Sequence, residues 1–129
     1  MKVQELLEKA TRAASSAKLL LDTGDTDGAC NRAYYAMFDA ARAALLASGA
    51  PIGSEVAKTH SGLITAFSLH LVKTGHVSVE LGKAFNKVED LRLVADYKGD
   101  PIETEEAAWA VQQAQRFVQT MKTTYLKKE

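Results

Sequence analysis

The stretch ACNRAYYAMFDAARAALLA, residues 29–47, decides the fold class of this chain. Eight of its residues are alanine, which has the highest helix propensity and a side chain small enough for neighbouring helices to approach closely. Asp25, Thr26 or Asp27 can cap its start, and Gly49 can end it. Apolar and aromatic residues cover most of its circumference. The stretch therefore predicts a helix at the centre of a bundle, or one whose second side faces a partner.

Four further segments repeat apolar residues at three- and four-residue spacing, which is typical of amphipathic helices. They span about residues 3–21, 59–73, 78–97 and 104–126. No segment alternates with a period of two over the length of a strand, and the connections are short. The sequence predicts an all-α fold, an antiparallel bundle of four to five helices that forms a single domain over residues 1–129.

Charge balance and cysteine content exclude several classes of function. Sixteen basic residues balance sixteen acidic ones, so no overall field draws the chain to nucleic acid or to a membrane, and RNA contacts require a local patch. The single cysteine, Cys30, excludes an internal disulfide and a cysteine-based zinc site. No run approaches the roughly 20 apolar residues of a spanning helix. A single cysteine suits a reducing cytosol, so we expect a cytoplasmic protein. We also expect no metal and no cofactor, since the sequence lacks the motifs of nucleotide-driven and hydride-transfer enzymes.

The first candidate site lies in the opening stretch. Arg32 and Tyr35 are three residues apart, and Tyr35 and Asp39 are four apart, so both pairs can share a helix face. An arginine beside two tyrosines in a largely apolar helix either lies at the edge of a site or pairs with a carboxylate from another helix. We take Arg32 and Tyr35 as candidate ligand-binding residues. The neighbouring aromatic residues, among them Tyr34 and Phe38, are interpreted mainly as core.

A second candidate is the string Lys58-Thr59-His60-Ser61-Gly62 at the start of a helix. Free N–H groups and the helix dipole favour an anion such as a phosphate there, and Lys58 is a candidate ligand-binding residue. His60 can act as a general acid or base near neutral pH. The alternative is an ordinary capping region with a surface lysine.

The third candidate is the string Arg92-Leu93-Val94-Ala95-Asp96-Tyr97. Arg92 and Asp96 are four residues apart, so one interpretation is a surface ion pair worth about 0.3–0.5 kcal/mol. In the functional interpretation Arg92 faces inward and grips a phosphate or a carboxylate, while Asp96 fixes the guanidinium in place.

These strings, in this order, resemble the HEPN family of small prokaryotic proteins. The matching pieces are residues 31–38 with 40–43, residues 58–64 and residues 91–97, and the resemblance extends over about Leu6 to Leu126. It implies a helical bundle that pairs with itself as a homodimer, a composite cleft near the dimer interface, and RNA or a nucleotide as ligand. Many members of that family are metal-independent ribonuclease toxins encoded beside a minimal nucleotidyltransferase that neutralises them.

The ribonuclease motif of that family is an arginine followed a few residues later by a histidine. Arg92 matches the arginine, but Tyr97 occupies the position five residues later. Tyrosine, with a reference pKa of about 10, is a poor base at neutral pH. His60 would replace the missing imidazole if the third helix starts beside the end of the fourth. The candidate catalytic residues are Arg92, His60 and Tyr97, and Asp96 joins the candidate ligand-binding residues.

Three functions remain open, in this order of preference. The first is an RNA- or nucleotide-binding module that works with a nucleotidyltransferase as a toxin–antitoxin-type pair. The second is a ribonuclease toxin that uses Arg92, His60 and Tyr97. The third is a structural dimerisation domain in which Arg32, Arg92 and Asp96 form internal ion pairs. Self-association is expected because the alanine-rich helix has more apolar surface than one bundle face needs; alternatively, the fourth and fifth helices cover it.

Overall fold

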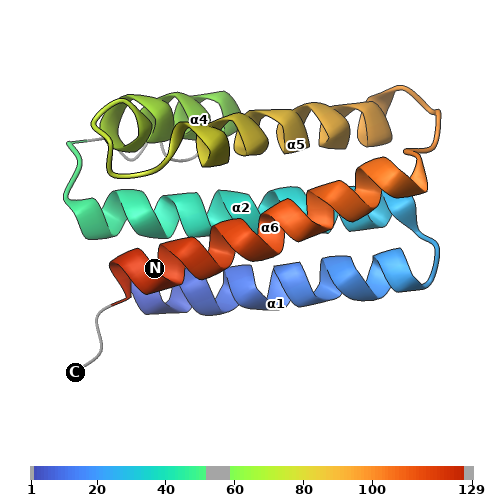
Figure 1. Ribbon diagram of the computed structural model, residues 1–129, viewed down its shortest axis with the longest axis horizontal. Helices are drawn as coiled ribbons and strands as arrows, with labels where there is room; N and C mark the ends of the chain where they lie inside the picture. The colour runs from blue at the N-terminus through green and yellow to red at the C-terminus, as the bar shows by residue number, and fades with distance from the viewer. Residues whose placement is uncertain (1, 52–58, 127–129) are drawn as a thin grey trace.

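The computed structural model describes residues 2–51 and 59–126, and these residues form an all-α bundle (Figure 1). Its elements are α1 (Val3–Asp22), α2 (Thr26–Ser48), α4 (His60–Phe67), the π-helical turn η1 (Ser68–Val72), α5 (Val79–Tyr97) and α6 (Thr104–Tyr125). The long helices run along one common axis, with α2 between α1 and α5 and with α6 crossing over it (Figure 1). No strand occurs in the described ranges, so the predicted fold class is confirmed.

Local capping explains where the helices begin and end. Among the three candidate caps of α2 the structure uses Asp25, whose side chain accepts a hydrogen bond from the Gly28 N–H at 2.8 Å. Asp27 instead accepts from the Ile102 N–H at 2.9 Å, and this bond ties the start of α2 to the turn before α6. Gly49 adopts φ 73°, a left-handed conformation that ends α2.

The starts of α4 and α5 follow the same rule. Thr59 accepts from the Gly62 N–H at 3.0 Å, and Ser78 accepts from the Leu81 N–H at 3.2 Å. Lys58 lies outside the described residues.

Helix α2 is covered over most of its surface by other helices of the same chain. It packs against α1, α6, α5 and α4, and every alanine of the opening stretch except Ala47 is buried. The alternative in which the fourth and fifth predicted helices cover this surface is the one that the structure supports, since α5 and α6 pack on α2, and α1 and α4 add to the cover. The expected excess of apolar surface on α2 was wrong, so it gives no reason to expect self-association.

The aromatic core fixes how the α4–α5 side of the molecule sits on the rest. Phe67, Phe85 and Phe117 come from α4, α5 and α6, and their ring centres lie 5.3 to 5.6 Å apart. Edge and tilted contacts of this kind stabilise packed aromatic rings. They hold the end of α4 against α5 and α6, while the start of α4 contacts α2 through His60 and Tyr34.

None of the helices in the described ranges combines the length and the hydropathy that crossing a membrane requires.

Candidate functional site

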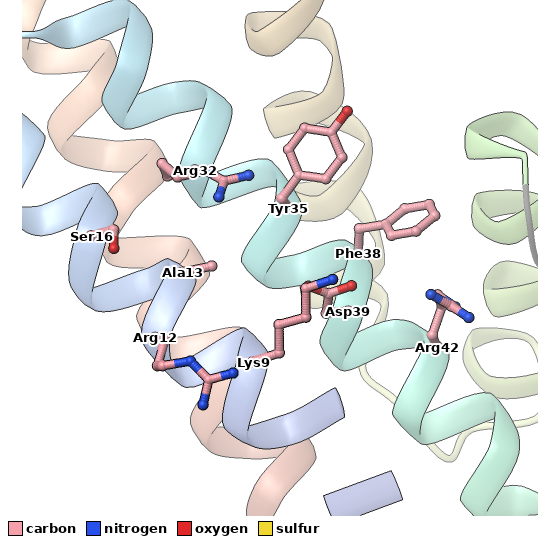
Figure 2. A pocket seen from close by; sticks show the side chains of 9 residues that line it. All are labelled: Lys9, Arg12, Ala13, Ser16, Arg32, Tyr35, Phe38, Asp39 and Arg42. Atoms are coloured by element: carbon pink, nitrogen blue, oxygen red, sulfur yellow. The ribbon is translucent and has the colours of Figure 1, made fainter. Parts of the chain in front are cut away.

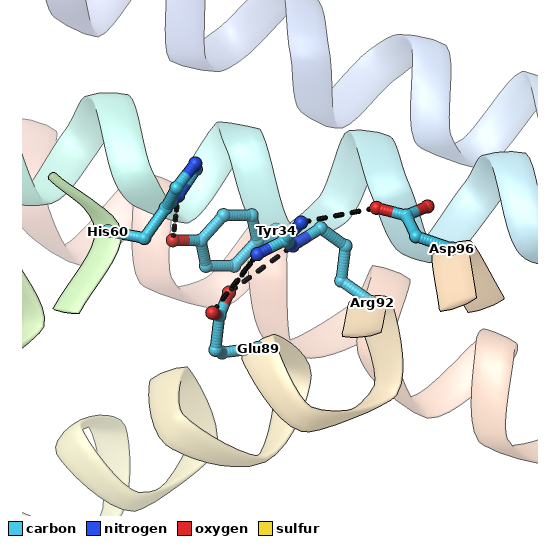
Figure 3. Close-up of polar contacts among 5 residues, drawn as sticks. All are labelled: Tyr34, His60, Glu89, Arg92 and Asp96. Carbon is cyan, nitrogen blue, oxygen red and sulfur yellow. Dashed lines mark hydrogen bonds and ion pairs between the residues drawn. The ribbon is translucent and has the colours of Figure 1, made fainter. Parts of the chain in front are cut away.

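Polar side chains gather in two places, on two faces of α2. We call the first the buried network, and its members are Tyr34, His60, Glu89, Arg92 and Asp96 (Figure 3). We call the second the basic pocket, and its lining is Lys9, Arg12, Ala13, Ser16, Arg32, Tyr35, Phe38, Asp39 and Arg42 (Figure 2).

Arg92 is the centre of the buried network, and its guanidinium faces inward. The residue is 5% exposed and its Cζ lies 4.7 Å from the centre of the Tyr34 ring. Its Nε and Nη2 donate to the Glu89 carboxylate at 3.3 and 3.0 Å, and its Nη1 donates to Asp96 at 3.1 Å (Figure 3). The inward interpretation of Arg92 is therefore the one observed, and the interpretation as a surface ion pair is wrong. The carboxylate that Arg92 binds with two of its nitrogens is that of Glu89 in the same chain.

Charge in the buried network is unfavourable for a phosphate. Burial by itself lowers the pKa of Arg92, but the hydrogen bonds and charges of Glu89 and Asp96 outweigh it, so that the pKa lies above its ordinary value. One cation therefore stands between two carboxylates, only 15% and 31% exposed at their side chains. A phosphate brought to Arg92 meets both negative charges. The two ion pairs join residues of α5 to one another, and the contact of the Arg92 guanidinium with the Tyr34 ring is what holds α5 against α2, so the network as it stands is a structural clamp.

His60 joins this network through Tyr34. The Tyr34 hydroxyl and the His60 Nδ1 are 2.7 Å apart, and Tyr34 is fully buried. Burial first, and then the negative charge of Glu89, raise the pKa of Tyr34 far above its usual value, so the phenol is neutral throughout the physiological range. His60 and Arg92 thus contact the same tyrosine, one at its hydroxyl and the other over its ring (Figure 3).

Tyr97 does not take part in the buried network. It is the last residue of α5 and its side chain is 76% exposed. Of the candidate catalytic residues the structure therefore brings together Arg92 and His60 but leaves Tyr97 apart. The third helix starts beside Tyr34 on α2, whose ring is also contacted by Arg92 of α5.

The basic pocket is a hollow of about 590 Å³ between α1 and α2 (Figure 2). Its α2 wall contains Arg32, Tyr35, Asp39 and Arg42, whose spacing of three or four residues places them on one helix face. The α1 wall contributes Lys9 and Arg12 with two small residues, Ala13 and Ser16. The small side chains leave the space, and the long cations surround it.

The cations of the pocket are not neutralised by the described part of the chain. Arg32 lies with its Cζ 5.3 Å from the centre of the Tyr35 ring, a cation–π contact. No ion pair of Lys9, Arg12, Arg32 or Arg42 with a carboxylate occurs among the described residues. The expected internal ion pair of Arg32 was therefore wrong, because the aromatic ring takes the place of the carboxylate.

Asp39 is the one acidic residue in the pocket lining and is 5% exposed. Burial raises its pKa, while the nearby charges of Lys9, Arg42 and Arg32 act in the opposite direction. Figure 2 shows the Lys9 side chain extending from α1 toward Asp39 on α2. Within the described ranges no hydrogen bond reaches this carboxylate. Its oxygens are not among the fully buried unpaired polar atoms of the described residues, so this carboxylate is an acceptor that opens onto the pocket in a basic surrounding.

The two groups adjoin at a wall of aromatic rings. The His60 ring centre lies 5.8 Å from that of Tyr35 and 5.1 Å from that of Phe38. Both of those residues also line the basic pocket. His60 therefore connects the two groups, and the pocket holds two of the predicted ligand-binding residues, Arg32 and Tyr35.

Sequence reasoning missed Glu89, Lys9, Arg12 and Arg42. Glu89 was detectable, because it precedes Arg92 by three residues and shares its helix face. Arg42 was detectable in the same way from its spacing to Asp39. The two residues of α1 carry no such signal, since their place opposite α2 depends on how the helices pack. In the described ranges, no three His, Cys, Asp or Glu side chains are grouped closely enough to hold a metal ion.

Comparison with known proteins places the chain. The pattern of the HEPN domain matches residues 3–124. The UPF0332 protein glr0978 of Gloeobacter violaceus is 34% identical over 118 residues, 90% of each chain. A Methanocaldococcus jannaschii protein named "Putative toxin MJ0605" is 35% identical over 120 residues, which are 93% of this chain and 86% of its own. The crystal structure of TT1696 from Thermus thermophilus has the same fold, with a TM-score of 0.75 at 22% identity over 95% of this chain and 97% of that one. On the match over nearly its whole length, this chain belongs to the HEPN domain family.

Proposed function

We propose that this chain is an RNA- or nucleotide-binding HEPN protein that acts as one member of a toxin–antitoxin-type pair, with a nucleotidyltransferase as the other member. The basic pocket is the observation that supports the binding of RNA or a nucleotide. It gathers four basic side chains around a single carboxylate in a chain whose net charge is zero. The toxin names of two relatives from Methanocaldococcus jannaschii support the pairing.

The pocket has the chemistry that a short single strand requires. Arginine and lysine bind phosphates, and an aromatic ring such as Tyr35 offers a base a surface for stacking. Arg32 and Arg42 are ten residues apart on α2, about 15 Å at the rise of an α-helix. That length exceeds one phosphate and favours a strand with at least two.

A binding assay tests this function. Labelled single-stranded RNA is titrated with the protein while fluorescence anisotropy is measured, first for the wild type and then for Arg12→Ala with Arg42→Ala. Loss of two phosphate contacts is expected to weaken binding by at least about tenfold and to reduce the dependence of log K on log salt by about 1.4. Lys83→Ala is the matched control, because Lys83 is an exposed lysine on α5 outside the pocket. Equal losses in the control and the pocket variant would contradict a pocket site.

The partner and the assembly state belong to the same proposal. This chain and the product of a neighbouring nucleotidyltransferase gene are co-expressed; growth arrest by this chain alone that the nucleotidyltransferase relieves would favour the ribonuclease toxin over the binding module. The two products should then purify together. Light scattering measures the molar mass, and twice the 14.0 kDa of one chain is expected for the homodimer. Failure of the two products to purify together would contradict the pairing.

A second candidate function, a metal-independent ribonuclease, is favoured by one specific observation. His60 and Arg92 contact the same tyrosine, so an imidazole and a guanidinium lie close together near the pocket wall. His60→Ala and Arg92→Ala, each compared with the wild type in an RNA-cleavage assay, test this function. Cleavage that persists at full rate in both folded variants excludes it.

A further inference from the structure

We propose that Asp39 makes the basic pocket select RNA over DNA, by accepting a hydrogen bond from a ribose 2′-hydroxyl of a strand whose phosphates lie on the surrounding cations. This inference rests on the proposed function, because it names what distinguishes the ligand within the same pocket. It assigns a role to a buried carboxylate that the binding of phosphates alone leaves unexplained.

The environment of the Asp39 carboxylate favours a ligand that donates a hydrogen bond. Asp39 is only 5% exposed, and it lines the pocket. A buried carboxylate is costly unless donors satisfy its oxygens. The described residues supply nearby positive charge, from Lys9, Arg42 and Arg32, but no hydrogen bond. A donor on a ligand in the pocket therefore finds an acceptor that is partly shielded from solvent, reachable, and without a protein donor among the described residues.

Positive and negative side chains alternate along the α2 wall of the pocket. On the same face of α2, Arg32 precedes Asp39 by seven residues and Arg42 follows it by three, about 10 Å and 5 Å along the helix. A negative group thus lies between two positive ones. A phosphate is repelled at the middle position and attracted at both ends. The group that fits the middle is a neutral hydrogen-bond donor with an anion on either side.

The backbone of RNA has this alternation. Each ribose lies between two phosphates and carries a 2′-hydroxyl, which is the group by which a protein distinguishes RNA from DNA. A carboxylate in a dinucleotide site recognises ribose hydroxyls by the same chemistry. Base N–H groups are donors too, but they project away from the line of phosphates. The sugar is therefore the part of the strand that reaches Asp39 when the phosphates lie on the arginines.

The experiment compares three oligonucleotides of one sequence, as RNA, as DNA and as 2′-fluoro RNA, by fluorescence anisotropy. The 2′-fluoro strand keeps an RNA-like sugar but cannot donate a hydrogen bond. The wild type is expected to bind RNA about tenfold more tightly than either of the others, the worth of one hydrogen bond to a charged acceptor. In Asp39→Asn the ratio is expected to fall to about threefold, because a neutral acceptor is about half as strong. DNA should bind Asp39→Asn more tightly than it binds the wild type, because a negative charge has been removed.

The outcomes separate this inference from the function on which it rests. If the wild type binds RNA and 2′-fluoro RNA equally, Asp39 does not read the 2′-hydroxyl. This test uses the wild-type protein alone, so it does not depend on whether a variant folds. The same conclusion follows if folded Asp39→Asn keeps the tenfold ratio. If Asp39→Asn changes the preference among bases instead, the donor is a base N–H and the proposal is overturned. If the wild type binds none of the three strands, the proposed function fails and this inference fails with it.

Discussion

Tyr34 and Tyr35 are neighbours in the sequence, and each lies under an arginine, but the two arginines have opposite surroundings. Arg92 lies 4.7 Å from the ring centre of Tyr34 and is held by two carboxylates. Arg32 lies 5.3 Å from the ring centre of Tyr35 and pairs with no carboxylate in the described ranges. The same two residue types therefore build a structural clamp on one face of α2 and part of an open pocket on the next. The carboxylates nearby and the degree of burial decide which of the two results.

The largest expected effect is the loss of the Arg92 clamp. Arg92→Ala leaves Glu89 in a mostly buried position without its cation, and breaking a buried ion pair in this way typically costs about 3–5 kcal/mol. Chemical unfolding followed by circular dichroism measures the free energy of unfolding. A second variant, Arg92→Met with Glu89→Gln, removes both charges and should recover a large part of the loss. A loss below about 1 kcal/mol for Arg92→Ala would mean that the ion pairs within α5 and the contact with the Tyr34 ring contribute no more than surface contacts do.

The comparison also shows how far the sequence alone could lead. The helices, the capping Asp25 and the central place of α2 follow from alanine content, apolar spacing and local side-chain hydrogen bonds, which are all short-range properties. An inward-facing Arg92 was one of the two interpretations of its string, and its pairing with Asp96 follows from their spacing of four residues. Both statements concern residues on one helix.

The remaining features depend on contacts between helices. Whether Lys9 and Arg12 face Asp39 is set by the packing of α1 against α2, and no spacing within one helix encodes it. The same holds for His60, which reaches Tyr34 across 26 residues of sequence. Tyr97 was predicted as a site residue from its position in a family motif, but it lies exposed at the end of α5, away from the buried network.

A smaller effect is expected at the link between the buried network and the aromatic wall. Tyr34→Phe removes the hydroxyl that pairs with His60 Nδ1 and leaves the ring under Arg92 unchanged. The loss of one hydrogen bond with a half-buried partner is expected to cost about 1–2 kcal/mol in the free energy of unfolding. NMR of the His60 ring should show a changed chemical shift at Nδ1, because that nitrogen loses its partner, while the aliphatic core signals stay in place. Unchanged stability together with an unchanged His60 signal would show that this bond contributes nothing.

On the pocket side, Asp39→Asn is expected to stabilise the protein, in contrast to the losses above. Because burial raises the pKa of Asp39 in the folded state, the ionised form is disfavoured by folding. The stability linked to this group is present when it is protonated, below its unfolded pKa, and is lost as the pH rises through its folded pKa. At pH 7 the variant should exceed the wild type by about 1 kcal/mol, and the difference should vanish in acid below the ordinary carboxyl pKa. A variant less stable than the wild type at pH 7 would show that the three cations outweigh burial.

The smallest expected effect is the one that separates the two arginines most directly. Arg32→Ala removes a half-buried cation–π contact and no hydrogen bond or ion pair of the described residues, so it should cost only about 0.5 kcal/mol in the free energy of unfolding. Its affinity for single-stranded RNA should nevertheless fall severalfold, because one phosphate contact is lost. Arg32→Lys, which keeps the charge but not the planar stacking on Tyr35, should restore part of that affinity. Arg92 is expected to behave in the reverse way, with a large cost in stability and no cation offered to the strand. If Arg32→Ala destabilises the fold as much as Arg92→Ala does, the two arginines play the same structural part, and the distinction between clamp and pocket does not hold.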